Sequence, residues 1–368
     1  MAVSQRRIDF RHTFPYFGQA SREPGSAVPH AHCATDGMKS PTDRHWLRSP
    51  FVRAIASLLL VVLLGAAFNA DGSFFQWGTH RDMLRQVSVY GILACGMTLI
   101  IISGGIDLSV GSILGCTAVI FSLLTIQWGW PAWWAVVCTL AAGSLLGSLS
   151  GGLLAYFRIQ PFIATLAMMV FARGLAKLIS GGQKVSTAVQ QADGSYAYVE
   201  VPHIFNSISA RMVADNIAVV TVILFVCIVI CWFVLSRLRT GRYLYAIGGN
   251  EEAARLSGIR VGLVKTVVYG LSGLFSAVAG ICQAAQELQG DPEAGNTYEL
   301  SAIAIVVIGG TSLRGGEGNI WMTLIGVLTI GYLEKILSIN AVGEESRLML
   351  TGLIIVGAVL LQKRSQFT

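Results

Sequence analysis

Apolar residues in this chain gather in ten runs that are separated by short polar or glycine-rich segments. Most runs hold roughly 20 residues, the length that an α-helix needs to cross the hydrocarbon core of a bilayer. One run, at residues 300–310, has about half that length and is too short to cross in full. The pattern predicts an all-α polytopic membrane protein of about ten transmembrane helices, some of them broken or short. The runs cover residues 51–68, 87–103, 108–126, 132–157, 162–179, 214–235, 265–285, 300–310, 320–339 and 347–361.

The composition also points to a membrane rather than to a soluble core. Hydrophobic residues make up 54% of the 368 residues and charged residues only 12%, against about 25% charged residues in soluble domains. Lipid must therefore be the solvent for most of this apolar surface. The net charge of +6 is gathered at particular loops and ends, which argues for orientation in a membrane and against a nucleic-acid partner.

Lys and Arg mark the segments that face the cytoplasm. Seven basic residues precede residue 51, six lie within residues 237–265, and two follow the last apolar run, whereas the loop 286–299 holds four acidic residues and no basic one. Ten spans with cytoplasmic N- and C-termini satisfy all four segments. Two basic pairs fall on the outer side and are expected to snorkel or to lie in interfacial or re-entrant segments: Arg81 with Arg85, and Arg173 with Lys177.

Two parts are expected along the chain. Residues 1–48 are rich in Ser, Pro, His and Arg and hold no apolar segment of the signal-peptide kind, which is typical of a disordered tail, here a cytoplasmic one. Residues 49–364 are expected to form the transmembrane domain. Met38 lies shortly before the first span, and we hypothesise that translation starts there.

Two glycine-rich breaks resemble each other. Gly104-Gly-Ile-Asp-Leu-Ser-Val-Gly111 and Gly309-Gly-Thr-Ser-Leu-Arg-Gly-Gly316 share their paired glycines, a Leu and the last Gly at the same spacing. Duplicated transporter halves leave such a trace, although chance in a glycine-rich chain would also explain it. Because broken helices expose polar ends where substrates bind, we expect the translocation path here. The candidate residues are Gly104, Gly105, Asp107, Ser109, Glu299, Gly309, Gly310 and Thr311.

Two carboxylates in these breaks each have two interpretations. A carboxylate between apolar runs is costly unless it is paired or solvated, which favours a functional role for Asp107. Asp107 is equally placed to cap a helix that starts at Leu108. Glu299 stands at the start of the short run, where it either stabilises the positive end of a half-helix or faces the path.

Three glycines in the run 132–157 recur at every fourth position. Gly143, Gly147 and Gly151 share one helix face, an arrangement that lets two helix backbones approach closely. We interpret this face as packing within the chain, with a contact between subunits as the alternative.

A charged segment at residues 241–260 interrupts the apolar pattern. Asn250 is expected to cap a short helix whose first turn holds acidic residues, and Gly258 is expected to end it. About two helical turns are unstable in water alone, so something must hold this helix. We interpret residues 250–258 as a cytoplasmic coupling helix that docks on a soluble partner, with an ordinary positively charged loop as the alternative. The expected coupling residues are Gly248, Gly249, Asn250, Glu251, Glu252, Ala253, Arg255 and Gly258.

The sequence holds no motif for catalysis or for cofactor binding. The Gly-Gly-Gln-Lys run that ends at Lys184 does not match a phosphate-binding loop, and neither His-Glu-x-x-His nor Gly-x-Ser-x-Gly occurs. None of the seven cysteines shows metal-ligand spacing with a histidine. We predict no catalytic residue, no metal and no cofactor, and we assign any ATP hydrolysis to a partner chain.

Several ordered motifs resemble the permeases of ribose/xylose/arabinose-type ABC importers, within the branched-chain amino acid/ribose permease superfamily. The resemblance covers about residues 48–363, and the long N-terminal extension departs from it. The motifs are Gly-Met-Thr-Leu-Ile-Ile-Ile-Ser-Gly-Gly-Ile-Asp-Leu-Ser-Val-Gly-Ser112, Ile159-Gln-Pro-Phe-Ile-Ala-Thr-Leu166, Gly241-Arg-Tyr with Ala246-Ile-Gly-Gly-Asn-Glu-Glu-Ala-Ala-Arg-Leu-Ser-Gly258, and Tyr298-Glu-Leu through Val307-Ile-Gly-Gly-Thr-Ser-Leu-Arg-Gly-Gly316.

The resemblance implies a multi-pass permease of the bacterial inner membrane that imports a monosaccharide. It implies a cytoplasmic ATP-binding subunit docked on residues 250–258, a periplasmic sugar-binding protein, a second permease copy, identical or not, and surrounding lipid. The alternatives are a permease for a branched-chain amino acid or a nucleoside, an ion-driven secondary carrier, and a membrane scaffold without transport. The near absence of acids and histidines within the spans weighs against the carrier.

Overall fold

The structure is a computed structural model, and it describes residues 50–157, 159–190, 195–212, 216–343, 345–350, 352, 353 and 356. Four sequence predictions lie outside these residues, in whole or in part. They are the N-terminal tail at 1–48, the proposed start at Met38, the C-terminal basic pair Lys363 and Arg364, and most of the last predicted span at 347–361.

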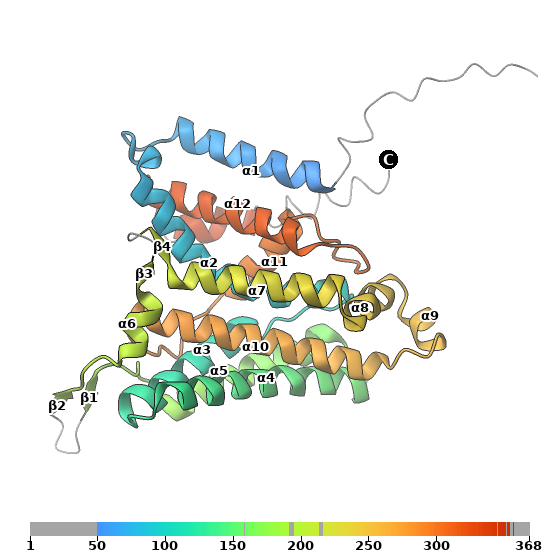
Figure 1. The fold of residues 1–368 in the computed structure, drawn as a ribbon, viewed down its shortest axis with the longest axis horizontal. Coiled ribbons are helices and arrows are strands. Elements are labelled where there is room, and N and C mark those ends of the chain that lie inside the picture. The colour runs from blue at the N-terminus through green and yellow to red at the C-terminus, as the bar shows by residue number, and fades with distance from the viewer. Residues whose placement is uncertain are drawn as a thin grey trace, which may run out of the picture. The chain divides into compact units, whose positions relative to one another are not determined.

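The described chain is mainly helical (Figure 1). Its long helices follow the apolar runs, and two of them, Ala132–Phe157 and Ile320–Ile339, have the bounds that the pattern predicts. The helices are α1 (Pro50–Ala67), α2 (Trp77–Ile102), α3 (Val110–Ser122) with its π-helical extension η3 (Leu123–Gln127), α4 (Ala132–Phe157), α5 (Pro161–Ser180), α6 (His203–Ser209), α7 (Val219–Ser236), α8 (Arg239–Gly249), α9 (Glu251–Leu256), α10 (Val261–Glu287), α11 (Tyr298–Ile308) and α12 (Ile320–Ile339), with a 3-10 turn, η2 (Ser73–Phe75), before α2.

Two small antiparallel hairpins complete the described fold. Strand β1 (Ala188–Gln190) pairs with β2 (Tyr196–Tyr198), and β3 (Arg211–Met212) pairs with β4 (Ile217–Ala218). Figure 1 shows both hairpins and α6 at one end of the long helices, with α8 and α9 at the opposite end.

Seven of the described helices are long and apolar enough to cross a membrane, counting α3 with η3 as one. Two shorter apolar helices, Phe51–Ala67 and Tyr298–Ile308, add to them. The predicted total of about ten spans and the cytoplasmic position of both termini stay predictions. The prediction that the run at residues 300–310 forms a short helix is confirmed by α11, which has 11 residues.

Helices α2 and α3 occupy the centre of the packing. In their most apolar windows 83% and 89% of the residues are buried, against 28% in α5 and 33% in α4. The break at residues 103–109 joins these two helices and is buried for the most part, whereas the break at residues 309–319 follows α11 and is only partly buried. Irregular backbone at membrane depth is tolerated only inside protein or along a water-filled cavity.

The glycine face of α4 packs against α10, as the internal-packing interpretation predicts. A Cβ atom added to Gly143 would lie 2.6 Å from the Gly273 carbonyl oxygen, and one added to Gly151 would lie 2.7 Å from Thr266 Cα. A Cβ on Gly147 would overlap the Tyr269 carbonyl oxygen. Small residues thus bring the two helix backbones into direct contact.

Candidate functional site

The short charged helix exists and has the predicted ends. The Asn250 side-chain oxygen accepts a hydrogen bond from the Ala253 N–H at 3.0 Å, which satisfies one of the free amides of the first turn. Gly258 has φ +83°, a left-handed conformation that favours glycine and ends the helix. The helix itself, Glu251–Leu256, is one turn and a half of backbone, shorter than residues 250–258.

Contacts with α10 hold this helix in place. The two Glu251 oxygens accept hydrogen bonds from Lys265 Nζ at 2.6 Å and from Arg255 Nη2 at 3.1 Å. Ala254 is buried and joins the main apolar core. Burial alone would raise the pKa of Glu251, but the hydrogen bonds and positive charges of Lys265 and Arg255 outweigh it and hold the pKa below its usual value. The support that a two-turn helix needs comes in part from this chain's own next helix.

The remaining side chains of α9 face outward. Glu252, Ala253 and Arg255 are exposed, and the Leu256 side chain is 81% exposed. Leu256 was not among the coupling residues predicted from the sequence, although a lone leucine on a charged helix is a signal for contact. The structure distinguishes two of the predicted residues: Glu251 binds Lys265 and Arg255 of its own chain, whereas its neighbour Glu252 is exposed.

Asp107 is fully buried between the two central helices and α10. Its Oδ1 atom accepts hydrogen bonds from the Ser109 backbone N–H at 2.9 Å and from the Ser109 hydroxyl, and its Oδ2 atom accepts from the Ser272 hydroxyl at 3.1 Å. The helix starts at Val110 with Ser109 as its N-cap, so the prediction that Asp107 caps a helix from Leu108 is wrong in its register. Asp107 instead stabilises the break two residues ahead of the cap and ties it to α10.

The starts of α3 and α11 lie against each other. A Cβ atom on Gly111 would lie 2.6 Å from Glu299 Oε2 and would overlap the Gly295 carbonyl oxygen. Glu299 is in the first turn of α11, the positive end of that helix, as predicted. Two non-glycine residues, Leu288 with φ 55° and Thr297 with φ 67°, bound the loop that leads into α11. Left-handed conformations at such residues store strain, which gathers at functional sites.

The predicted path residues differ in exposure. Most of them are enclosed within this single chain, so a path along them would need a change of conformation or would pass at their edge. Gly105, Asp107, Ser109, Gly309 and Thr311 are buried, Glu299 and Gly310 are half-buried, and Gly104 is exposed.

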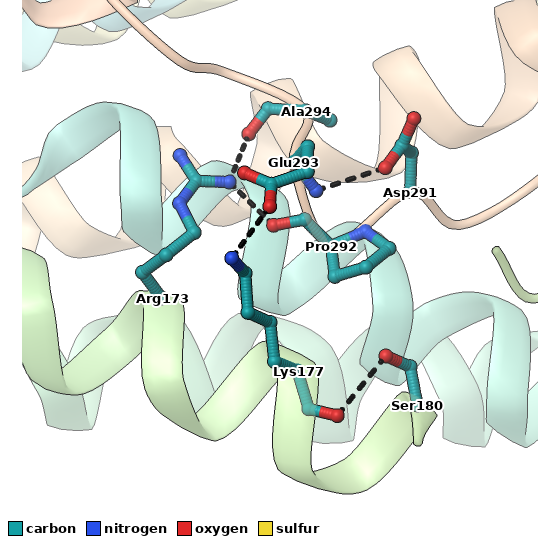
Figure 2. Close-up of polar contacts among 7 residues, drawn as sticks. All are labelled: Arg173, Lys177, Ser180, Asp291, Pro292, Glu293 and Ala294. Carbon is teal, nitrogen blue, oxygen red and sulfur yellow. Dashed lines mark hydrogen bonds and ion pairs between the residues drawn. The ribbon is translucent and has the colours of Figure 1, made fainter. Parts of the chain in front are cut away.

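A second polar cluster, missed by the sequence analysis, joins α5 to the loop before α11 (Figure 2). Arg173 Nη1 donates hydrogen bonds to the carbonyl oxygens of Pro292 and Ala294, the latter at 2.8 Å. Lys177 Nζ lies 2.6 Å from a Glu293 oxygen. Figure 2 shows both basic side chains reaching from one helix to the same loop.

These contacts account for one of the two basic pairs that the predicted topology places on the outer side of the membrane. Arg173 and Lys177 both contact the acidic loop 286–299, which is predicted to lie on the same side. Lys184, just beyond α5, adds a further pair, with its Nζ 2.9 Å from Asp291 Oδ2. The signal in the sequence was the coincidence of unpaired cations and unpaired anions on one predicted side of the membrane.

Among the described residues, no group of three or more His, Cys, Asp or Glu side chains could hold a metal ion. The described cysteines are all free thiols. The capped helix α9, the two breaks and the α5 cluster are the polar arrangements that bear on the predicted sites, and broken helices with polar ends are a feature of transport proteins.

Comparisons with known proteins agree with this class. Residues 81–359 match the family described as the branched-chain amino acid transport system / permease component. The ribose import permease protein of Escherichia coli strain K12 is 38% identical over 326 residues, which cover 88% of this chain and 97% of the relative. The fructose import permease protein of Rhizobium meliloti is 34% identical over 87% of both chains. The xylose transport system permease protein of Escherichia coli strain K12 is 31% identical over 84% of this chain and 90% of the relative.

No solved structure matches the chain. The family match covers well over half of the residues, and the chain therefore belongs to the family of branched-chain amino acid transport system permease components. It is a multi-pass membrane protein with seven described helices that are long and apolar enough to span.

Proposed function

We propose that this chain is the membrane-spanning permease subunit of a bacterial ABC importer for a monosaccharide, either a ribose-like pentose or a related sugar. The relatives named for ribose, fructose and xylose import support the sugar class. The observation that carries the proposal is the short helix α9, which is capped, anchored to α10 and exposed on the face that a partner would meet.

The partner at α9 is a cytoplasmic ATP-binding subunit. The exposed side chains of Glu252, Arg255 and Leu256 offer a mixed charged and apolar contact of the kind that fills a small cleft. ATP hydrolysis belongs to that subunit, since this sequence holds no phosphate-binding loop. Closure of the ATP-binding subunits would displace α8 and α9 and shift the permease between two conformations.

The end of the helices opposite α9 would face the periplasm and receive a sugar-binding protein. A second permease copy, identical or not, would complete the translocation path within the lipid of the inner membrane. The exposed apolar side chains of α4, α5 and α7 are available for that copy or for lipid. The broken segments around Asp107 and Glu299 are the proposed edge of the path.

A second candidate is a permease for a branched-chain amino acid, and the family description supports it. A nucleoside is a further cargo that this architecture would accept. An ion-driven carrier is a different class, because it would take up its substrate without an ATP-binding partner.

Uptake into proteoliposomes tests the proposal. The permease, its ATP-binding subunit and its binding protein would be reconstituted together and supplied with labelled pentoses, hexoses, leucine or adenosine. We expect ATP-dependent uptake of one monosaccharide and none of leucine or adenosine. Uptake of leucine or adenosine alone would move the cargo to another class, and uptake driven by an ion gradient without ATP would refute the importer assignment.

A further inference from the structure

Three segments far apart in the sequence meet through backbone atoms at the base of the coupling region. They are the last residue of α2 with the start of the break (Ile102–Gly104), the end of α8 (Gly248–Gly249), and the loop before α12 (Gly315–Gly316). We call these three segments together the glycine junction. The Gly316 N–H donates a hydrogen bond to the Ile102 carbonyl oxygen at 2.9 Å. A Cβ atom on Gly315 would lie 2.8 Å from Gly104 Cα and 3.0 Å from Gly248 Cα.

Gly248 stands at the tightest point of this junction. A Cβ atom added there would overlap both the Ile102 carbonyl oxygen and the Gly316 nitrogen. Both obstacles are backbone atoms, so no side-chain rotation relieves the overlap. The phenol of Tyr245, one turn earlier in α8, adds a second tie because it donates a hydrogen bond to the Gly318 carbonyl oxygen at 2.9 Å.

Each of the three segments belongs to a different working part. Gly248 and Gly249 end α8 and lead directly into α9. Gly104 opens the break that holds Asp107, and Gly315 and Gly316 lie in the loop that follows α11. A movement of α8 and α9 therefore meets both breaks at once, with no side chain between that could absorb it.

The far end of α11 is also held. The loop before it is tied to α5 by the two hydrogen bonds of Arg173 to backbone carbonyl oxygens. The 11-residue helix thus runs from the α5 cluster towards the glycine junction. A short helix that lies between two such tethered loops moves as one piece, since close-packed protein transmits displacement rather than deforming.

We propose that the glycine junction passes the movement of α8 and α9 to both broken segments, and that Gly248 is a positioning residue for this coupling and not a docking residue. The inference rests on the proposed function, because it assumes an ATP-binding partner that moves α9. Gly248 was predicted to lie in the surface that docks the partner; we now place it in the contact between α8 and the two broken segments.

The test compares two alanine variants of helical glycines in the full assembly. Gly248→Ala inserts a methyl group into the junction, whereas the control Gly152→Ala adds one in α4 where no atom lies within 4 Å. Both permeases would be reconstituted with the ATP-binding subunit and the binding protein. The measurements are co-purification of the ATP-binding subunit, ATP hydrolysis and the amount of sugar taken up per ATP hydrolysed.

We expect Gly248→Ala to bind the ATP-binding subunit normally and to lower sugar uptake per ATP by roughly tenfold, since overpacking of one methyl group biases a two-state equilibrium by about that factor. Gly152→Ala should match the unchanged protein. Unchanged uptake per ATP in Gly248→Ala would overturn the inference, as would loss of the ATP-binding subunit from that variant, because the latter places Gly248 in the docking surface.

If Gly248→Ala inserts poorly into the membrane, a milder variant tests the same contact. Tyr245→Phe removes only the hydrogen bond to Gly318, and it should lower uptake per ATP by roughly twofold to tenfold, the factor expected for one hydrogen bond. An unchanged ratio in the inserted Tyr245→Phe protein would overturn the inference. Failure of the unchanged assembly to take up any monosaccharide with ATP would instead refute the proposed function, so the two failures are distinguishable.

Discussion

At the scale of single residues, the two adjacent glutamates of α9 have opposite roles. Glu251 is bound by Lys265 and Arg255, whereas Glu252 is exposed. Sequence alone favoured both as docking residues, because both lie in the first helical turn. Only the position of Lys265 on the neighbouring helix separates them.

Reversal of the exposed charge should uncouple the transporter. We expect Glu252→Arg to insert and fold normally, since the Glu252 side chain is exposed, and to abolish ATP-driven uptake. Co-purification of the ATP-binding subunit and uptake in proteoliposomes would measure this. Glu200→Arg, an exposed glutamate just after β2, is the matched control, and full transport by Glu252→Arg would contradict the docking assignment.

The anchoring of α9 by Glu251 should depend on pH. Because its folded-state pKa is lowered below the ordinary 4.5, the stabilisation is fully present above that value and is lost as the pH falls through the lower folded-state pKa. Hydrogen exchange of the α9 amides, corrected for the intrinsic rate, should therefore show protection at neutral pH that Glu251→Gln lacks. Equal protection in Glu251→Gln and the unchanged protein at pH 7 would contradict this.

We expect substitutions of Asp107 to lower the stability of the protein. Asp107→Ala leaves two buried serine hydroxyls and one N–H without their acceptor, at a cost of about 3 kcal/mol. Asp107→Asn keeps one accepting oxygen and should cost less. Thermal unfolding in detergent should rank Ala below Asn and Asn below the unchanged protein, and a neutral effect of Asp107→Ala would exclude the structural role.

At the scale of elements, the loop before α11 depends on α5. Arg173 binds two backbone carbonyl oxygens that no other residue of the cluster reaches, whereas Lys177 and Glu293 are about half exposed. The Lys177–Glu293 ion pair should therefore stabilise the loop less than the Arg173 hydrogen bonds do, because an exposed ion pair is worth only about 0–1 kcal/mol.

Two methionine variants should therefore behave differently. Arg173→Met should lower stability by about 2 kcal/mol, the cost of leaving two partly buried carbonyl groups unpaired, and Lys177→Met by less than about 1 kcal/mol. Thermal unfolding together with limited proteolysis at residues 288–297 would measure both. Equal effects of the two variants would show that charge alone, and not the carbonyl contacts, holds the loop.

At the scale of the whole molecule, the α8–α9 end and the hairpin end should face opposite compartments. A cysteine at Leu256 is expected to react with an impermeant maleimide only after the inner membrane is opened, and a cysteine at Lys184 to react in intact spheroplasts. Both variants would carry Cys33→Ser, because Cys33 lies in the predicted cytoplasmic tail; the described native cysteines are buried or half-buried and give little background. Labelling of Leu256→Cys from outside would reverse the proposed topology.

The apolar helices followed from local patterns, and α4 and α12 match the predicted bounds residue for residue, whereas α2 begins at Trp77, ten residues before the predicted run at 87–103. The Asn250 cap and the Gly258 terminator were also predictable, because capping depends on side chains within one helical turn. The register of Asp107 was missed, since its third hydrogen bond comes from Ser272 on α10 and no local pattern contains that contact.

The sequence by itself determined the membrane class, the apolar helices, the short charged helix and the two breaks, because each depends on the period or chemistry of neighbouring residues. Only the tertiary structure decided that Glu251 faces its own subunit, that Arg173 holds the loop before α11, and that Gly248 contacts Ile102 and Gly316. Those contacts join residues from separate helices, and their specificity comes from close packing of backbones that sequence neighbours do not encode.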